Sequence, residues 1–470
     1  MTNIRFATES YLHDSKPLSA QRAINCYAER QPKGAKVPIA VFGVPGISTF
    51  TTLGSGPIRA LFEMNEVAYA VSGQNFYTFD ETGASTLLGT GITGYKPVSV
   101  DGTGFEIVIR NGLNGFSYVL SPSSFAQISD GDFQQGNTVT VLNNIFCFDW
   151  LNTNKFFTSE VLDGRTYDAL DFASAESDPD FIKAVRAHNG TLFLLGNHTI
   201  EPWDNTGAAD FAFSRIKGGT IDRGVIASLA VENEDSSMFI LGDDLIAYRI
   251  NGLQLQRIST HALEREWRSY STTSDVFSFK ISDSGHKFIY FTFPTENRTF
   301  AYDIATGLWH ERMSWDAGGM ETRWRANCAV TAYSKTLIGD ANSGKIGFVD
   351  PSVYTEFGDP IISTMTSPPL YMDGQNISVP VLEVDMHSGV GLTTGQGSDP
   401  QVMLDWSTDG GRTYTAPQEW ASFGMIGDNR RRVIFNGLGE GYEFTFRLRI
   451  SDPVKRVVYA ARCPGLYAAR

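Results

Sequence analysis

Apolar and polar residues alternate along most of the chain in short stretches separated by tight polar turns. The segment 57–83, PIRALFEMNEVAYAVSGQNFYTFDETG, predicts three strands with turns at Met64–Glu66 and Ser72–Asn75. Turn signals such as Asn111-Gly112 mark the next unit. Units of the same kind follow at 104–129, 137–160, 182–207, 224–259, 277–312 and 325–350. Because a unit like this cannot bury both faces alone, the repeat predicts a β-propeller with six or seven blades.

The pattern changes near residue 360, where Pro368-Pro369 interrupts it and longer strands follow. In EFTFRLRISDP (443–453), every second residue from Phe444 to Ile450 is apolar, which is the alternation of a half-buried strand. The expected strands lie at 379–389, 400–408, 412–415, 431–439, 442–453 and 454–467. We therefore expect an all-β chain, with a propeller over 1–362 and an antiparallel β-sandwich over 363–470. Within the propeller, the segment 1–55 is expected to contribute a closing strand.

One stretch favours a helix. In STHALEREWRSYS (259–271), Leu263 and Trp267 share one face, and Ser259 or Thr260 can cap the first turn. We expect a short helix at the edge of a blade.

Composition supports a large packed core and narrows the class of protein. Hydrophobic residues make up 42% of the chain, and the formal charge of −14 argues against a protein that grips nucleic-acid phosphates through a basic face. It does not exclude an acidic channel through which DNA slides, because like charge repels phosphate. The four cysteines, Cys26, Cys147, Cys328 and Cys463, are isolated, so we expect buried thiols rather than disulfides or a zinc site. No apolar run is long enough to span a membrane, and the N-terminus lacks a signal peptide, so we expect a soluble protein made in the cytosol.

The stretch STDGGRTYT (407–415) has the spacing S-x-D-x-G-x-T-aromatic, carried by Ser407, Asp409, Gly411, Thr413 and Tyr414. This spacing resembles the Asp-box of sialidases and other propeller glycosidases. Its chemistry is that of a turn: Asp409 can accept N–H bonds from its own loop, and Gly410 and Gly411 supply positive φ. We expect Thr413 and Tyr414 to begin the return strand, with the ring packing beneath. Since a glycosidase needs two opposed catalytic groups and this motif supplies none, we interpret it as a structural turn.

Other candidate chemistry is sparse. His188 and His198 flank the strand TLFLLG and could approach each other across a hairpin, but no third ligand stands at a useful spacing. The motifs H-E-x-x-H and G-x-S-x-G are absent. The run 430–432, three arginines, is the densest positive cluster; we favour a solvated strand edge over a subunit contact. We assign no catalytic, cofactor-binding or metal-binding residues, and expect no enzyme.

Several segments resemble segments of a known protein family and occur in the same order along the chain. They are RAINCYAERQP (22–32), FGVPGI (42–47), GPIRALFEMNEVAYAVSGQNFY (56–77), FASAESDPDFIKAVRAHNGTLFLLGNHTIEPWDNTGAA (172–209), RISTHALEREW (257–267) and VMLDWSTDGGRTY (402–414). Together they resemble the packaged-DNA stabilisation or tail-hub (nozzle) proteins of short-tailed bacteriophages. The resemblance covers nearly all of the chain.

The resemblance implies a hexameric propeller ring in the virion tail, assembled in the host cytoplasm below the portal and adaptor. Such a ring closes or extends the tail channel, retains the packaged DNA and conducts it on ejection. It implies as partners other copies of the chain, the portal–adaptor protein, a tail needle, fibres or spikes, and double-stranded DNA that passes without sequence readout. The alternatives are a glycan-binding or glycan-degrading phage receptor protein and a propeller scaffold of a cellular complex.

Overall fold

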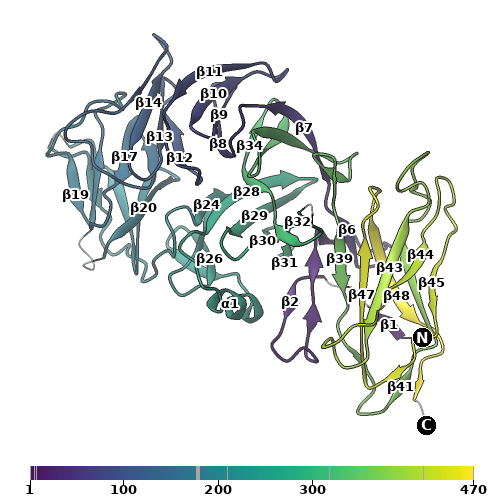
Figure 1. Ribbon diagram of the computed structural model, residues 1–470. Coiled ribbons are helices and arrows are strands. Elements are labelled where there is room, and N and C mark those ends of the chain that lie inside the picture. Colours follow the sequence, from purple (N-terminus) through teal and green to yellow (C-terminus); the bar gives the residue numbers. More distant parts are fainter. Residues whose placement is uncertain are drawn as a thin grey trace.

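The computed structural model describes residues 2–4, 6, 8–175, 180–208, 210–316, 318–416 and 418–468, and Figure 1 shows the arrangement of their strands. Strands fan out around an axis on one side of the molecule, and a sandwich of two sheets stands at the other. The predicted all-β class, a propeller followed by a sandwich, is confirmed. Residues 176–179 and 209, part of the family-like segment 172–209, lie outside the described residues.

Six blades are sheets of four consecutive antiparallel strands. Blade one contains β8 (Ile58–Met64), β9 (Val67–Ser72), β10 (Asn75–Phe79) and β11 (Ser85–Thr90). Blade two contains β12 (Ser99–Gly102), β13 (Glu106–Arg110), β14 (Gly115–Val119) and β15 (Ser124–Gln127). Blade three contains β16 (Val139–Leu142), β17 (Ile145–Asp149), β18 (Lys155–Thr158) and β19 (Phe172–Ser174). Blade four contains β20 (Ile182–His188), β21 (Thr191–Gly196), β22 (Ile200–Asn205) and β23 (Phe213–Arg215). Blade five contains β24 (Val231–Glu234), β25 (Ser237–Leu241), β26 (Ala247–Asn251) and β27 (Gln254–Arg257). Blade six contains β28 (Phe277–Asp283), β29 (His286–Phe293), β30 (Arg298–Asp303) and β31 (Trp309–Glu311).

A seventh blade is built from both parts of the chain. It contains β34 (Ala326–Ala332), β35 (Lys335–Asp340), β36 (Lys345–Asp350) and, from the N-terminal region, β7 (Gly46–Thr52). Strand β7 runs antiparallel to β36, so this blade joins the two ends of the propeller. The pair β37 (Thr355–Glu356) and β38 (Asp359–Pro360) extends its outer edge, and the hairpin of β32 (Met313–Trp315) and β33 (Glu321–Arg323) precedes it.

The turn between the first two strands recurs from blade to blade. In six of the seven described blades it has two residues, both with positive φ, as a tight hairpin with the twist of its strands requires. These turns are Asn65-Glu66, Asn143-Asn144, Asn189-Gly190, Asp235-Ser236, Ser284-Gly285 and Tyr333-Ser334. The first strands of the blades surround the propeller axis, where they line a cavity of about 170 Å³.

The sandwich takes strands from both ends of the chain. One sheet has the order β45 (Val433–Asn436), β42 (Val381–Met386), β48 (Val457–Cys463), β6 (Ile39–Gly43) and β5 (Cys26–Arg30), and β1 (Thr2–Ile4) also pairs with β48. The other contains β44 (Glu419–Ser422), β43 (Gln401–Ser407), β47 (Glu443–Ile450), β39 (Ser363–Thr366), β40 (Leu370–Tyr371) and β4 (Ala23–Ile24). The short strands β41 (Ile377–Ser378), β46 (Glu440–Gly441) and β49 (Tyr467–Ala468) form a third sheet. Strands β1, β4, β5 and β6 lie within the expected propeller segment 1–362 but belong to the sandwich sheets.

Strand β4 makes the two domains continuous. It pairs with β31 of blade six on one side and with β39 on the other, which gives a ten-stranded sheet running from β28 to β44. The apolar side chains of β47 face the sandwich core, as their alternation predicts: Phe444, Phe446, Leu448 and Ile450 are all buried.

The predicted helix is α1 (His261–Arg268), and Thr260 rather than Ser259 is its N-cap. Leu263 and Trp267 are buried against the core of blade six, as their spacing predicts. The helix also reaches the N-terminal hairpin of β2 (Tyr11–Leu12) and β3 (Ala20–Gln21), because Arg265 forms an ion pair of 2.8 Å with Asp14. No helix in the described part of the chain is long and apolar enough to cross a membrane.

Candidate functional site at the junction of propeller and sandwich

The Asp409 carboxylate lies inside the turn that follows β43. Its Oδ1 accepts hydrogen bonds from the backbone N–H groups of Arg412 and Thr413, both at 2.9 Å. The Ser407 hydroxyl donates to the same oxygen at 2.6 Å, and the Thr413 hydroxyl donates to Oδ2 at 2.7 Å. Desolvation raises the pKa of Asp409, but these hydrogen bonds outweigh it and hold the pKa well below its ordinary value. The carboxylate is thus ionised and saturated by its own loop.

The expected return strand at 412–415 is wrong. Asp409 takes the N–H groups of two of these residues, which leaves them unavailable to a sheet, and the return strand β44 begins at Glu419. The Tyr414 ring packs instead against the guanidinium of Arg447, 3.8 Å from the ring centre. Arg447 is in turn bound to the buried carboxylate of Asp405.

The glycines of the Asp-box turn face the N-terminal hairpin β2–β3. A Cβ atom on Gly411 would lie 2.6 Å from the Ala20 Cβ, and one on Gly410 would lie 2.9 Å from the Pro17 Cβ. Both glycines have positive φ, of 86° and 73°. The turn therefore holds a hairpin whose other side reaches α1 on the propeller. The sequence motif gives no signal for this contact, because the partner lies about 390 residues away in the chain.

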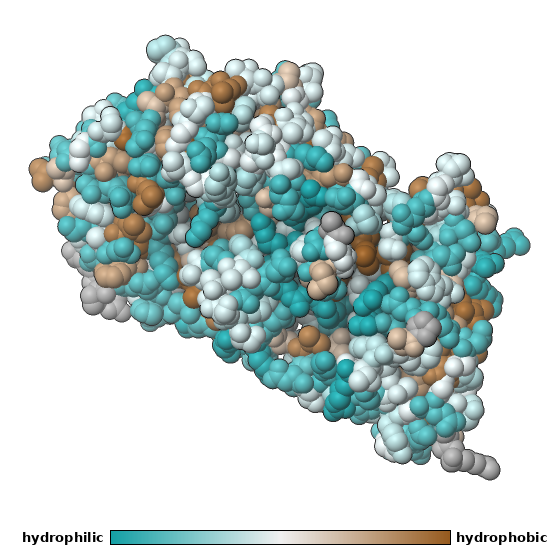
Figure 2. Space-filling view, viewed as in Figure 1, coloured by the Kyte–Doolittle hydropathy of each residue, from teal (hydrophilic) through white to brown (hydrophobic). Residues whose placement is uncertain are grey.

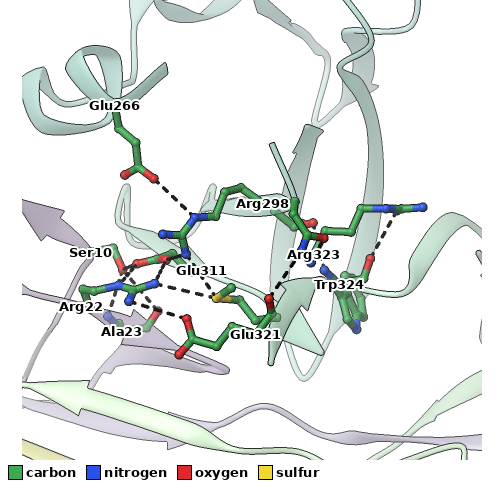
Figure 3. A network of polar contacts seen from close by, with 12 residues as sticks. Ser10, Arg22, Ala23, Glu266, Arg298, Glu311, Glu321, Arg323 and Trp324 are labelled. Atoms are coloured by element: carbon green, nitrogen blue, oxygen red, sulfur yellow. Dashed lines mark hydrogen bonds and ion pairs between the residues drawn. The ribbon is translucent and has the colours of Figure 1, made fainter. Parts of the chain in front are cut away.

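An ionic cluster around the buried carboxylate of Glu311 lies at the base of the same hairpin (Figure 3). The Arg22 guanidinium donates from Nε to Glu311 Oε1 at 3.0 Å, and a second nitrogen lies 2.5 Å from Oε2. Ser10 donates to the same carboxylate at 3.0 Å, and Arg298 approaches it to 3.4 Å. Burial raises the pKa of Glu311, but Arg22 and Arg298 more than offset that and lower it below the ordinary value. The cluster fixes the N-terminal segment to β31 of blade six.

Asn25 makes a second set of contacts that hold the N-terminal segment, and its side chain is buried, with 1% of the residue exposed. Its Nδ2 donates to the carbonyl oxygens of Met313 and Ile362, both at 2.9 Å, and its Oδ1 accepts from Met313 N at 3.1 Å. Its φ is 53°, a left-handed conformation that asparagine tolerates better than most residues. One side chain thus joins the N-terminal segment, the chain after blade six and the connection to the sandwich.

The two histidines considered as a pair do not meet. His188 is paired with Thr191 at one end of the β20–β21 hairpin, whereas His198 follows Gly196 at the other end and contacts Asp243 at 3.1 Å. Among the described residues, no group of three or more His, Cys, Asp or Glu side chains could hold a metal ion. All four cysteines are free; three are buried and Cys328 is half-buried.

Known sequences and solved structures give only weak likenesses to this chain. No curated protein sequence matches the chain. The extracellular domain of the putative one-component system BT4673 from B. thetaiotaomicron is 10% identical, with a TM-score of 0.44 over 82% of this chain and 48% of that one. The β-propeller domain of Cps50 (Swd1) from Myceliophteria thermophila is 9% identical, with a TM-score of 0.42 over 64% of this chain and 98% of that one. At these scores, neither likeness carries an argument about function.

Two family models match the sequence itself. The model described as "Bacteriophage P22 Gp10, beta-propeller" matches residues 19–354, and the model described as "Bacteriophage P22 Gp10, beta-sandwich" matches residues 363–464. Their order along the chain is that of the two domains in the structure. The chain belongs to the bacteriophage P22 Gp10 family, a family of structural phage proteins.

Proposed function

We propose that this protein forms a ring of six copies in the virion tail, below the portal–adaptor assembly. The ring closes or extends the tail channel, retains the packaged DNA and conducts it on ejection. The observation that carries this proposal is the match of both domains, in order, to the P22 Gp10 models. The portal–adaptor protein would bind at one end of the ring, and a tail needle, fibres or spikes at the other. Assembly would take place in the host cytoplasm.

The propeller axis bears on the route of the DNA. The cavity on the axis has a volume of about 170 Å³, and its lining includes the buried Arg59 and the Arg186–Glu232 ion pair. A DNA duplex, whose major groove alone is about 12 Å wide, does not fit there. The conducting lumen must therefore lie between copies, around the axis of the ring. The formal charge of −14 suits a lumen wall that repels phosphate and reads no sequence.

The alternative, a glycan-degrading or glycan-binding receptor protein, depends on the Asp-box. Asp409 is saturated by hydrogen bonds from Ser407, Arg412 and Thr413, and so offers no free carboxylate to a substrate. The turn also packs on the chain's own N-terminal hairpin. We propose that these residues are structural and that the protein is not an enzyme.

Native mass spectrometry of the full chain, alone and mixed with its portal–adaptor complex, tests the proposal. We expect a six-copy ring that docks to the complex. Hydrolysis of host polysaccharide is measured in parallel, with Asp409→Ala as the matched variant. A trimer that degrades polysaccharide would overturn the proposal and favour the receptor alternative.

A further inference from the structure

Charge is distributed unequally between the two halves of the chain. Residues 1–362 contain 28 Lys and Arg against 41 Asp and Glu, for a net charge of −13, whereas residues 363–470 contain 10 against 11, for −1. On the face shown in Figure 2, hydrophobic residues are interspersed with hydrophilic ones, so no broad apolar surface marks an interface there. Charge complementarity is the better guide to how copies meet.

The sandwich carries an exposed basic surface, which we call the cationic face. It consists of the exposed loop 425–432 after β44 together with Lys36, and Arg430, Arg431 and Lys36 line a cavity of about 340 Å³ that Asp385 also lines. Lys36 is paired with Asp385 at 2.7 Å, and Arg432 approaches Glu383 to 3.6 Å. Arg430 and Arg431 are exposed and have no ion-pair partner among the described residues.

Exposed apolar side chains lie on the same loop as these two arginines. Met425 and Ile426, on the same loop, are 57% and 63% exposed. Leu392 is 40% exposed, and it follows Gly391, whose Cβ position lies 2.9 Å from the Ile426 backbone nitrogen. Arginine next to exposed Met is typical of protein–protein interfaces rather than of a solvated strand edge. The composition therefore favours a protein partner with an acidic surface.

The propeller has a groove of the opposite charge, which we call the acidic groove. It lies between blades one and seven, has a volume of about 800 Å³, and is lined by residues of β8–β11 and by the β34–β35 turn. No Lys or Arg is among its lining residues. Four acidic residues line it, namely Glu63, Glu66, Asp80 and Glu81. Glu66 and Glu81 are exposed and have no ion-pair partner in the described part of the chain.

We propose that the cationic face of one copy docks in the acidic groove of a second copy. The inference rests on the proposed ring and names the contact that builds it. Strands β10 and β11 lie away from the sandwich in Figure 1, so the sandwich of the same copy does not cover these strands. A contact between two different surfaces of identical chains is heterologous, and when its rotation closes it generates a ring. Arg430 and Arg431 then gain Glu66 and Glu81 as partners.

A charge-swap experiment on the full chain tests this contact by native mass spectrometry and light scattering. Arg430→Glu/Arg431→Glu should weaken ring assembly at least about tenfold, and adding Glu66→Lys/Glu81→Lys to the same chain should restore it. Lys16→Glu/Lys217→Glu makes the same change in net charge at two exposed lysines elsewhere and should leave the ring intact. Circular dichroism checks that each variant folds.

The outcomes separate this inference from the proposed function. If the wild-type chain forms no ring, the proposed function fails, and this inference fails with it. If the arginine variant still forms the ring, or if the groove variant does not rescue it, the contact is wrong while the ring stands. Loss of affinity for a DNA duplex with an unchanged ring would overturn the inference in favour of a nucleic-acid surface.

Discussion

Replacing Asn25 should separate two contributions to the stability of the junction between propeller and sandwich: the hydrogen bonds of the Asn25 side chain and the left-handed conformation of its backbone. In the Asn25→Ala variant, the buried N–H and C=O groups of Met313 and the half-buried C=O group of Ile362 lose this hydrogen-bond partner. Alanine must also adopt the left-handed φ of 53°. In Asn25→Gly the hydrogen bonds are lost in the same way, but glycine takes this φ without strain. The difference between the two variants therefore isolates the backbone conformation.

The magnitudes follow from burial. A buried polar group left without a partner costs about 1–3 kcal/mol, and water that enters the space recovers part of that. We expect Asn25→Gly to lose roughly 2–5 kcal/mol of the free energy of unfolding. The left-handed conformation costs alanine about 1–2 kcal/mol more. Asn25→Ala should thus be less stable than Asn25→Gly, the reverse of the usual order of these residues in regular structure.

Urea denaturation followed by tryptophan fluorescence measures both variants, because Trp309 and Trp324 are buried on the propeller side of the junction. Asn152 supplies the matched control: its φ is 57°, but its side chain is exposed. Asn152→Gly should be nearly neutral, whereas Asn152→Ala should show the backbone cost alone. The reasoning is refuted if Asn25→Gly is as stable as the wild type, or if Asn25→Ala and Asn25→Gly unfold together.

Three further predictions concern the Asp-box turn and a buried histidine. Asp409→Ala should lower the free energy of unfolding by about 1–2 kcal/mol, measured by thermal denaturation, because the turn loses its hydrogen-bond acceptor; an equally stable variant would contradict this. Gly410→Ala would place a Cβ 2.9 Å from the Pro17 Cβ, so we expect the N-terminal hairpin to be displaced and cleaved faster by protease. Gly427→Ala, with φ of 85° and nothing within 4 Å, is the control for conformation alone, and equal proteolysis of the two would refute the steric argument. The hydrogen bond to Asp303 raises the pKa of His286 above 6.5, with burial opposing. The pair of protonated His286 and Asp303 therefore stabilises the fold fully below pH 6.5, and this stabilisation is lost as the pH rises through the raised pKa. The urea midpoint of the wild type should fall over this pH range, whereas the midpoint of His286→Gln should not show that fall.

The sequence predicts the blades well where local turn chemistry determines them. Asn143-Asn144 lies at a hairpin tip because asparagine accepts positive φ at both positions. The turn at Tyr333-Ser334 has the same conformation without any such residue, so the strands and not the turn residues impose it. Nothing in β7 indicates that its partner is β36, since that pairing is set only when the ring of blades closes. Contacts between distant segments are where prediction from sequence fails.

The candidate site shows the same limit. The internal geometry of the Asp-box turn follows from its own residues, because Ser407, Asp409 and Thr413 satisfy one another within a few residues. Its role in the molecule depends on Pro17 and Ala20, which no local pattern links to it. The expected strand at 412–415 fails for a related reason: the turn motif predicts that the return strand begins directly after the turn, but Asp409 competes for the backbone N–H groups of Arg412 and Thr413.

The continuity of the sheet has a mechanical consequence for the proposed ring, which would retain packaged DNA. Because β4 bridges β31 and β39, a force on the sandwich is transmitted to blade six through backbone hydrogen bonds rather than through a flexible linker. The hairpin β2–β3 adds a second connection, held by the Asp-box turn at one side and by the Asp14–Arg265 ion pair at the other. Two connections that are separate in space resist rotation of the sandwich about either one. A subunit coupled in this way can keep the cationic face and the acidic groove at a fixed separation, and a closed ring of identical contacts requires that rigidity.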